Sequence, residues 1–311
     1  MFWACYYVAF QNMPFTHTET FTYLLVAIFI FALTKAFKPG STKKYIFLAG
    51  FMMGYIVLTK VAFGFVLLFM LAGSALLWLI KRKAVNYRKG LFITLIGLAT
   101  ISPYMIYIYQ LTGRVFYWST TAGSALYWSS SPYKDEYGDW KLELKQGPVE
   151  MGNYNIPGSG DSLVAHHQKE YDEIYKYKGL EQDDAFKRIA INNIKQHPLK
   201  YLQNCIYNAG RLVFHYPFSQ AVQRPKVLLI FPVNGIIFTL MLFSLVPTFK
   251  NWKKISYPLR FMLFFTLLYL GASLLVVAYV RMFTIIVPVL LFWFAFIFQR
   301  SVKVNLDFKE E

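Results

Sequence analysis

The stretch that decides the fold runs from residue 261 to residue 299 and reads FMLFFTLLYLGASLLVVAYV, then Arg281, then MFTIIVPVLLFWFAFIFQ. Each apolar run is about 20 residues long, enough for a helix to cross a hydrocarbon core of ~30 Å. Because Arg281 alone separates the two runs, the sequence predicts a tight hairpin of two membrane helices with a lone cation at its turn.

Other apolar runs of similar length extend this pattern along the chain. The opening MFWACYYVAF is about half as long as a span, and we read it as the tail of a helix whose beginning is missing. It lacks the basic region and small-residue cleavage site of a signal peptide. The full set of predicted membrane helices comprises 20–37, 45–59, 62–80, 90–111, 227–249, 261–280 and 282–299.

Composition supports an all-α polytopic membrane protein. The chain is 56% hydrophobic and only 15% charged, so little of it is suited to fold in water. We expect N-terminal membrane helices over 1–111, one external insert of irregular and helical structure over 112–226, C-terminal membrane helices over 227–300, and a cytoplasmic tail over 301–311.

Lysine and arginine in the short loops predict the orientation, since such residues accumulate on the cytoplasmic side. All the basic clusters fall on one side, which makes the Lys60 turn, the insert and the Arg281 turn external. The net charge of +16 is then a topology signal, and it gives no reason to expect a nucleic-acid partner. The clusters are Lys38, Lys43 and Lys44; Lys81, Arg82, Lys83, Arg88 and Lys89; Lys250, Lys253, Lys254 and Arg260; and Arg300 and Lys303.

The insert divides into two parts. Residues 114–160 are rich in Gly, Ser, Pro and aromatics, which favours irregular structure held against the bilayer by Trp and Tyr. Residues 162–178 and 183–213 have helical periodicity, and Pro198 is expected to break the second run into two short helices, the latter lying on the membrane surface. The adjacent His166 and His167 are interpreted as part of a solvated face.

The cysteines and the absence of glycosylation sequons indicate the cellular compartment of the external insert. The only cysteines, Cys5 and Cys205, cannot form a disulfide within the insert, and no N-x-S/T sequon occurs. These absences favour a bacterial inner membrane, crossed several times, with the large loop in the periplasm.

Three charged residues are candidates for chemistry at the external face. Lys60 and Arg281 are basic residues in loops predicted to be external, where such residues are scarce, and they could bind a phosphate. Arg281 is the better suited of the two because guanidinium binds phosphate in bidentate fashion. Glu19 opens an apolar helix and could act as a general base. The alternatives are that Glu19 merely complements the helix dipole and that the two cations reach for lipid head groups. Gly50 and Gly54 read as a helix-packing pair.

Four ordered segments resemble the GT-C class of membrane glycosyltransferases that use polyprenyl-phosphate sugars, such as protein O-mannosyltransferases and lipid A aminoarabinose transferases. The likeness covers most of the chain. The segments are MPFTHTETFTYLL with Glu19; GFMMGYIVLTK with Gly50, Gly54, Thr59 and Lys60; SPYMIYIYQLTGRVFYWSTTAGSALYWSSSP; and YVRMFTIIVP with Arg281.

The resemblance implies a GT-C-like helical bundle in which Glu19 is catalytic and Lys60 and Arg281 bind the donor phosphate. It implies a polyprenyl-phosphate sugar as donor, a lipid, glycan or protein as acceptor, membrane lipids as surroundings, and no cofactor or metal. Further candidate substrate contacts are His17, Tyr107, Trp118 and Trp128. His17 could orient an acceptor, and the tryptophans could stack on sugar or line the isoprenoid tail, although a membrane-interface aromatic belt explains them too.

Departures from the family pattern are also present. Tyr107 stands where relatives usually place Arg, Thr284 where Pro is common, and nothing before Glu19 is acidic, although relatives carry an Asp-bearing loop there. The last departure predicts that the chain lacks the family's N-terminal helix and first external loop.

Other function classes remain open at this stage. A transporter is disfavoured because the spans hold almost no charge away from their ends. A lipid-linked polysaccharide polymerase or ligase would use external arginines, for which Arg211 and Arg224 are candidates. An inactive truncated remnant is the third alternative.

Overall fold

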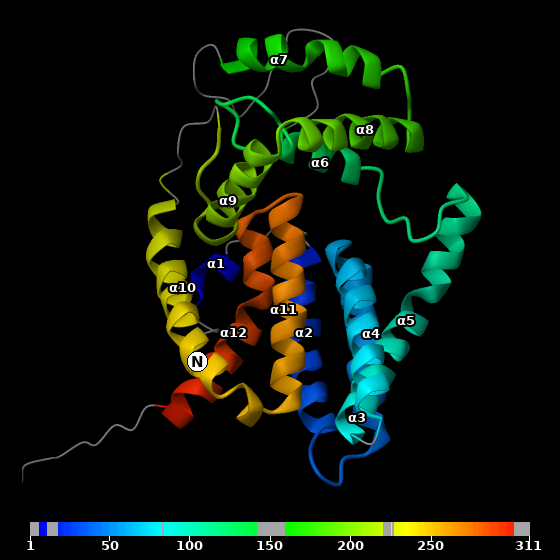
Figure 1. The fold of residues 1–311 in the computed structure, drawn as a ribbon, viewed down its shortest axis with the longest axis vertical. Coiled ribbons are helices and arrows are strands. Elements are labelled where there is room, and N and C mark those ends of the chain that lie inside the picture. Colours follow the sequence, from blue (N-terminus) through cyan, green and yellow to red (C-terminus); the bar gives the residue numbers. More distant parts are fainter. Residues whose placement is uncertain are drawn as a thin grey trace, which may run out of the picture.

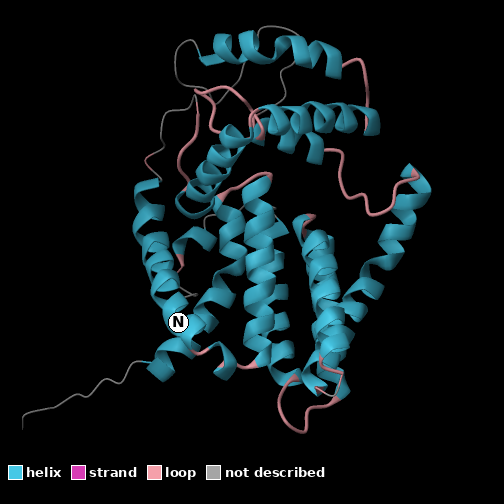
Figure 2. Ribbon diagram, in the orientation of Figure 1, coloured by secondary structure: helices cyan, strands magenta, loops and turns pink. Residues whose placement is uncertain are grey.

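The protein is a helical bundle covered at one end by a second layer of helices (Figure 1). The computed structural model describes residues 6–10, 18–82, 84–141, 159–219, 225 and 227–301, and every regular element within those ranges is a helix (Figure 2). The predicted all-α polytopic membrane fold is therefore confirmed. Six helices are long and apolar enough to cross a membrane: α2 (Thr18–Ala36), α4 (Ala62–Ile80), α5 (Val85–Thr112), α10 (Val227–Lys250), α11 (Tyr257–Leu275) and α12 (Val280–Ser301).

The remaining predicted span, 45–59, forms α3 (Lys43–Thr59), whose 17 residues make it shorter than the six. It runs antiparallel to α2 and packs tightly on α5 through two glycines. A Cβ on Gly50 would come within 2.6 Å of Ile96, and one on Gly54 within 2.6 Å of Thr100. The interpretation of Gly50 and Gly54 as a helix-packing pair is confirmed.

Charge separates the two ends of the bundle. We call the end where α2 and α12 begin the capped end, because α6–α9 lie over it (Figure 1). The opposite end, which we call the basic end, carries the basic loops predicted to be cytoplasmic. One of its lysines caps a helix, since Lys89 Nζ donates to the carbonyl of Ala36 at 2.7 Å, where α2 stops.

The outer surface of the bundle is apolar, as lipid contact requires. Phe69, Phe243, Phe249 and Leu267, which belong to three of the membrane spans, are each exposed by more than 60%. Such large exposed side chains would be unfavourable in water and are stable against acyl chains.

The covering layer consists of α6 (Ala122–Ser129), α7 (Ser159–Ile174), α8 (Leu180–Gln196) and α9 (Pro198–Phe214). The predicted break at Pro198 is confirmed, since Pro198 starts α9 and only His197 separates it from the end of α8. The expectation of irregular structure across 114–160 was wrong for α6. A short helix forms there because Asp183 accepts a hydrogen bond from the Gly123 N–H at 2.5 Å, close to the helix N-terminus.

Helix α9 has an inverted amphipathic pattern. Its polar side chains Asn204, Asn208 and Arg211 are buried, whereas Leu199 and Ile206 are more than 60% exposed. An apolar face turned outward next to a membrane bundle suits the boundary between lipid and water, as the sequence predicted for this segment.

The covering layer is fixed to the bundle through the last carbonyls of α11. Tyr201 donates to the carbonyl of Leu275 at 2.8 Å, and Asn208 donates to that of Leu274 at 2.8 Å. These carbonyls have no partner within their own helix, so α9 satisfies them. The loop that follows leads directly to Arg281.

The opening segment contributes one helical turn, α1 (Tyr7–Phe10). The Tyr6 hydroxyl donates to Asn234 Oδ1 at 2.6 Å, which ties this segment to the buried side of α10.

Candidate functional site

Glu19, Lys60 and Arg281 meet at the capped end of the bundle. Glu19 Oε1 lies 2.7 Å from Lys60 Nζ and 3.3 Å from Arg281 Nε. The three residues come from the first turn of α2, the α3–α4 hairpin and the first turn of α12. Sequence analysis selected each of them separately, and the fold brings them together.

Exposure differs across this cluster, which we call the charged cluster. The Glu19 side chain is 2% exposed, that of Lys60 is 20% exposed and that of Arg281 is 36% exposed. One buried carboxylate therefore faces two cations that keep access to the surroundings. With both cations charged, the cluster carries a net charge of +1, which favours binding of an anion.

Hydroxyl groups hold the helices that supply these residues. Thr22 Oγ1 of α2 lies 3.0 Å from Thr59 Oγ1, next to Lys60. The Tyr23 hydroxyl lies 2.5 Å from Thr284 Oγ1, which in turn donates to the carbonyl of Arg281 at 2.6 Å. Thr284 thus links α12 to α2.

Stacked aromatic rings fix α4 against α11 near the same end. Phe63 stacks on Tyr269 with ring centroids 4.2 Å apart, and the Tyr269 hydroxyl donates to the carbonyl of Met282, next to Arg281, at 3.3 Å. Sequence analysis missed Tyr23 and Tyr269, because a tyrosine within an apolar helix has no local signal that distinguishes it from a core residue.

Buried polar atoms at this end that have no hydrogen-bond partner among the described residues include Thr20 Oγ1 and Trp118 Nε1. Glu19 Oε1 and Arg281 Nε, by contrast, are partners in an ion pair. Buried polar groups are rarely left unpaired, and such groups at a surface end favour a ligand site.

Trp118 lies at the capped end of α4. A Cβ on Gly64 would come within 2.7 Å of its indole ring, so only glycine permits this approach. The ring also stacks on Tyr104 of α5 with centroids 5.9 Å apart. Tyr107, one turn further along α5, is 56% exposed, and the structure does not bring it to the charged cluster.

The segment that carries Trp118 is anchored by two aspartates of α8. Arg114 forms a bidentate ion pair with Asp184, which holds the pKa of Asp184 below its ordinary value. Burial and a hydrogen bond to Asp183 at 3.0 Å raise the pKa of Tyr117 to about 12. These contacts with α8 therefore hold the segment that carries Trp118 in place.

Trp128 lies in the core of the covering layer. It is 1% exposed and packs with Tyr127, Tyr171 and His167. Its burial was not predicted, because the serine-rich segment around it has the composition of an irregular loop, whereas it folds as α6.

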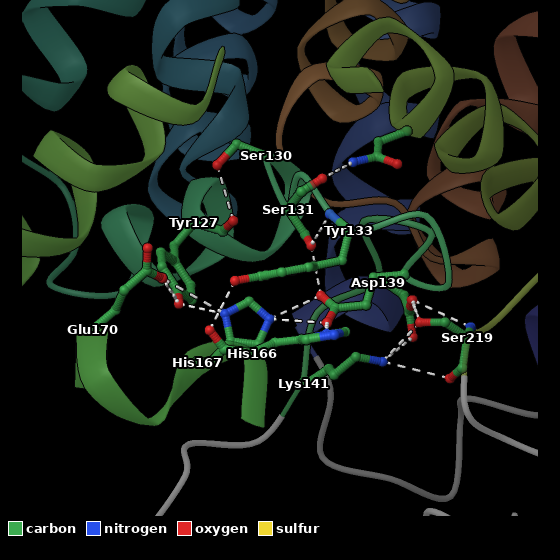
Figure 3. Close-up of polar contacts among 12 residues, drawn as sticks. Tyr127, Ser130, Ser131, Tyr133, Asp139, Lys141, His166, His167, Glu170 and Ser219 are labelled. Atoms are coloured by element: carbon green, nitrogen blue, oxygen red, sulfur yellow. Dashed lines mark hydrogen bonds and ion pairs between the residues drawn. The ribbon is translucent and has the colours of Figure 1, made fainter. Parts of the chain in front are cut away.

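The prediction for His166 and His167 also needs correction. His167 is buried and, with His166, contacts the buried Glu136. Both histidines lie beside Tyr133 (Figure 3). A solvated face is therefore wrong for His167. The periodicity of 162–178 missed this because Glu136 comes from a distant irregular segment.

The remaining candidate residues are Arg211, His17 and Arg224. Arg211 is 1% exposed, and its guanidinium donates to the carbonyls of Pro217 and Tyr137, each at 2.9 Å, so it has a structural role. His17 and Arg224 lie outside the described residues.

Comparison with known proteins finds no relative of this chain. No family model, curated protein or solved structure matches the chain.

Proposed function

We propose that the protein is a membrane glycosyltransferase that moves a sugar from a polyprenyl-phosphate donor to an acceptor at the external, periplasmic face of a bacterial inner membrane. The observation that carries this proposal is the convergence of Glu19, Lys60 and Arg281 at one end of a membrane bundle. The resemblance of their sequence segments to GT-C enzymes supplies the reaction class.

The cations fit the electrostatic demand of the reaction. As the bond between the sugar C1 and the phosphate oxygen breaks, negative charge grows on the departing phosphate. Lys60 and Arg281 would stabilise this charge, and a site with little water strengthens such interactions. The donor's isoprenoid tail remains in the bilayer, so its phosphate reaches the depth at which these helix ends lie.

Glu19 is the one acidic residue of the charged cluster and the proposed acceptor of the hydroxyl proton. In that role its carboxylate takes the proton while the acceptor oxygen bonds to C1. Its contacts with both cations also give it a positioning role, because it keeps two like charges within reach of a single anion.

A polymerase or ligase with a second lipid-linked substrate is less well supported. Arg211, one of two arginines that could have engaged such a substrate, is buried and fully occupied by backbone carbonyls and Asn208.

Sugar transfer in membranes tests the proposal. Membranes containing the full chain are supplied with a panel of radiolabelled sugars linked to polyprenyl phosphate, and label in non-donor products is counted. We expect Lys60→Ala and Arg281→Ala each to lower transfer by about 100-fold, the typical cost of removing one transition-state donor. Lys254→Ala, an exposed lysine at the basic end, is the matched control. Undiminished transfer by both site variants would refute the proposal.

A further inference from the structure

A second charged site lies within the covering layer, away from the membrane bundle. Glu136 comes from the segment after α6. His166 and His167, drawn in Figure 3, are consecutive residues of α7. His166 Nδ1 lies 2.9 Å from Glu136 Oε1, and His167 Nε2 lies 2.9 Å from Glu136 Oε2. Their three ligand atoms lie within 4.8 Å of one another.

The carboxylate of this triad is buried. Glu136 is 1% exposed, and Ser131 Oγ donates to its Oε2 at 2.6 Å. A carboxylate removed from water is stable as an anion only beside a cation.

The Tyr127 hydroxyl lies on the far side of His167. It donates to Glu170, and its oxygen is 2.6 Å from His167 Nδ1. With the hydroxyl proton directed at Glu170, the Tyr127 oxygen accepts from His167 Nδ1–H, and a neutral ring then presents the lone pair of Nε2 to Glu136.

That arrangement is repulsive unless a positive centre lies between the two groups. Nε2 is 2.9 and 3.0 Å from the two oxygens of Glu136, so a lone pair would face an anion at contact distance. Either a second proton on His167 or a metal ion at Nε2 removes this repulsion.

The surroundings match those of a metal-binding histidine. A ligating imidazole usually donates its other ring N–H to a carboxylate, a backbone carbonyl or water. Here the Tyr127 oxygen, which is itself hydrogen-bonded to Glu170, takes that place beside His167 Nδ1. The His166 ring is held flat against Tyr133, with centroids 3.7 Å apart and planes at 3°. Both imidazoles are thus oriented before any ion binds.

We propose that Glu136, His166 and His167 bind a divalent transition metal ion, Zn²⁺ in the first instance, as a structural site of the covering layer. Two imidazole nitrogens and one carboxylate oxygen form a donor set that Zn²⁺ accepts. Tetrahedral ligands at ~2.1 Å from zinc are roughly 3.4 Å apart, so the 2.9 Å nitrogen–oxygen pairs need to open by about 0.5 Å. The two imidazole nitrogens, which lie within 4.8 Å of each other, need to move closer together as the ion binds. The 26% exposure of the His166 side chain provides a route for the ion and for a water ligand.

The ion would join two parts of the covering layer that are distant in sequence. Residue 136 lies in the segment that Lys200 of α9 holds through the Glu136 carbonyl at 2.6 Å. The site therefore links α7 to the same segment that α9 fixes over the bundle. This role is independent of sugar transfer.

Metal analysis of the whole protein tests this site. The chain is purified in detergent without a polyhistidine tag, treated with a chelator and titrated with Zn²⁺ against a chromophoric competitor. We expect one tight equivalent for the wild type and affinity lowered by more than about 10-fold in Glu136→Gln and His166→Gln. Tyr127→Phe, which removes the oxygen behind His167, should weaken binding by about 10–100-fold.

A matched variant and a wild-type measurement complete the test. His197→Gln, which changes an exposed histidine outside the triad, should bind Zn²⁺ as the wild type does. X-ray absorption of the zinc-loaded wild type should show two imidazole ligands, and this result does not depend on any variant folding. A shell of oxygen ligands alone, or equal zinc binding by the wild type and His166→Gln, would overturn the proposal and leave the second proton as the cation between His167 and Glu136.

Discussion

Arg281 occupies the first turn of α12, where the helix dipole opposes a cation. A charge of the wrong sign there costs ~0.3–1 kcal/mol at an exposed site. Glu19 offsets this cost, and it lies in the first turn of its own helix, where the dipole favours an anion. The pair is thus asymmetric: Glu19 is well placed without Arg281, whereas Arg281 needs Glu19 or another anion.

Substitutions at Glu19 separate its two proposed roles. If Glu19 is the base, Glu19→Gln should lower kcat by about 10²–10⁴-fold with little change in donor KM. If it only positions the cations, the donor KM should rise while kcat falls modestly. Steady-state kinetics with varied donor concentration distinguishes these results, and Glu19→Asp, which keeps the charge, is the matched comparison. Kinetics identical to the wild type in Glu19→Gln would exclude both roles.

The sequence predicted the site residues by their unusual locations and not by their contacts. Lys60 and Arg281 were noticeable because they oppose the charge bias of the loops, and Glu19 because it opens an apolar helix. The burial of Trp128 and His167 was not predicted, because burial in the covering layer depends on α6, α7 and α8 meeting in space. No periodicity within one segment encodes such a meeting.

At the scale of elements, glycine determines how closely α3 approaches α5. Gly54 leaves no room for a methyl group, since a Cβ would lie 2.7 Å from the carbonyl oxygen of Gly97. This close contact fixes the position of α3 against α5, and Lys60 is the residue that caps the end of α3. The helix pattern was predictable from sequence, but the partner of the glycine face was not.

Gly54→Ala should therefore destabilise the protein, by about 1–3 kcal/mol as expected for overpacking. The matched control is Gly271→Ala in α11, where an added Cβ meets nothing within 4 Å and the better helix propensity of Ala should be neutral or stabilising. Thermal unfolding in detergent measures the stability of both variants. Equal Tm values for the two variants would mean that α3 does not pack on α5 as described.

At the scale of the whole molecule, the charge distribution predicts which end of the bundle faces the periplasm. In a chain with Cys5→Ser and Cys205→Ser, Val61→Cys in the α3–α4 hairpin should react with a membrane-impermeant maleimide in cells with permeabilised outer membranes. Lys253→Cys at the basic end should react only after the inner membrane is disrupted. Both positions are exposed, so accessibility reports the side of the membrane. The reverse pattern would place the charged cluster in the cytosol and remove the basis for periplasmic transfer.

The hydropathy pattern made the membrane architecture predictable, because lipid allows few alternatives to the helix. The covering layer was less predictable. Its helices are stabilised by contacts such as Asp183 with Gly123 and Tyr201 with Leu275, which join segments far apart in sequence. Pro198 was an exception, since proline acts locally on the backbone.

Equilibrium binding of polyprenyl phosphate to the purified full chain tests the central claim most directly, since it measures recognition of the phosphate without requiring the right sugar. The wild type should bind the phosphate at least about 10-fold more tightly than the polyprenol of equal length, a difference of ~1.4 kcal/mol, and the double variant Lys60→Ala, Arg281→Ala should bind the two lipids equally. Equal binding of both lipids by the wild type, or an undiminished preference for the phosphate in the double variant, would contradict the account.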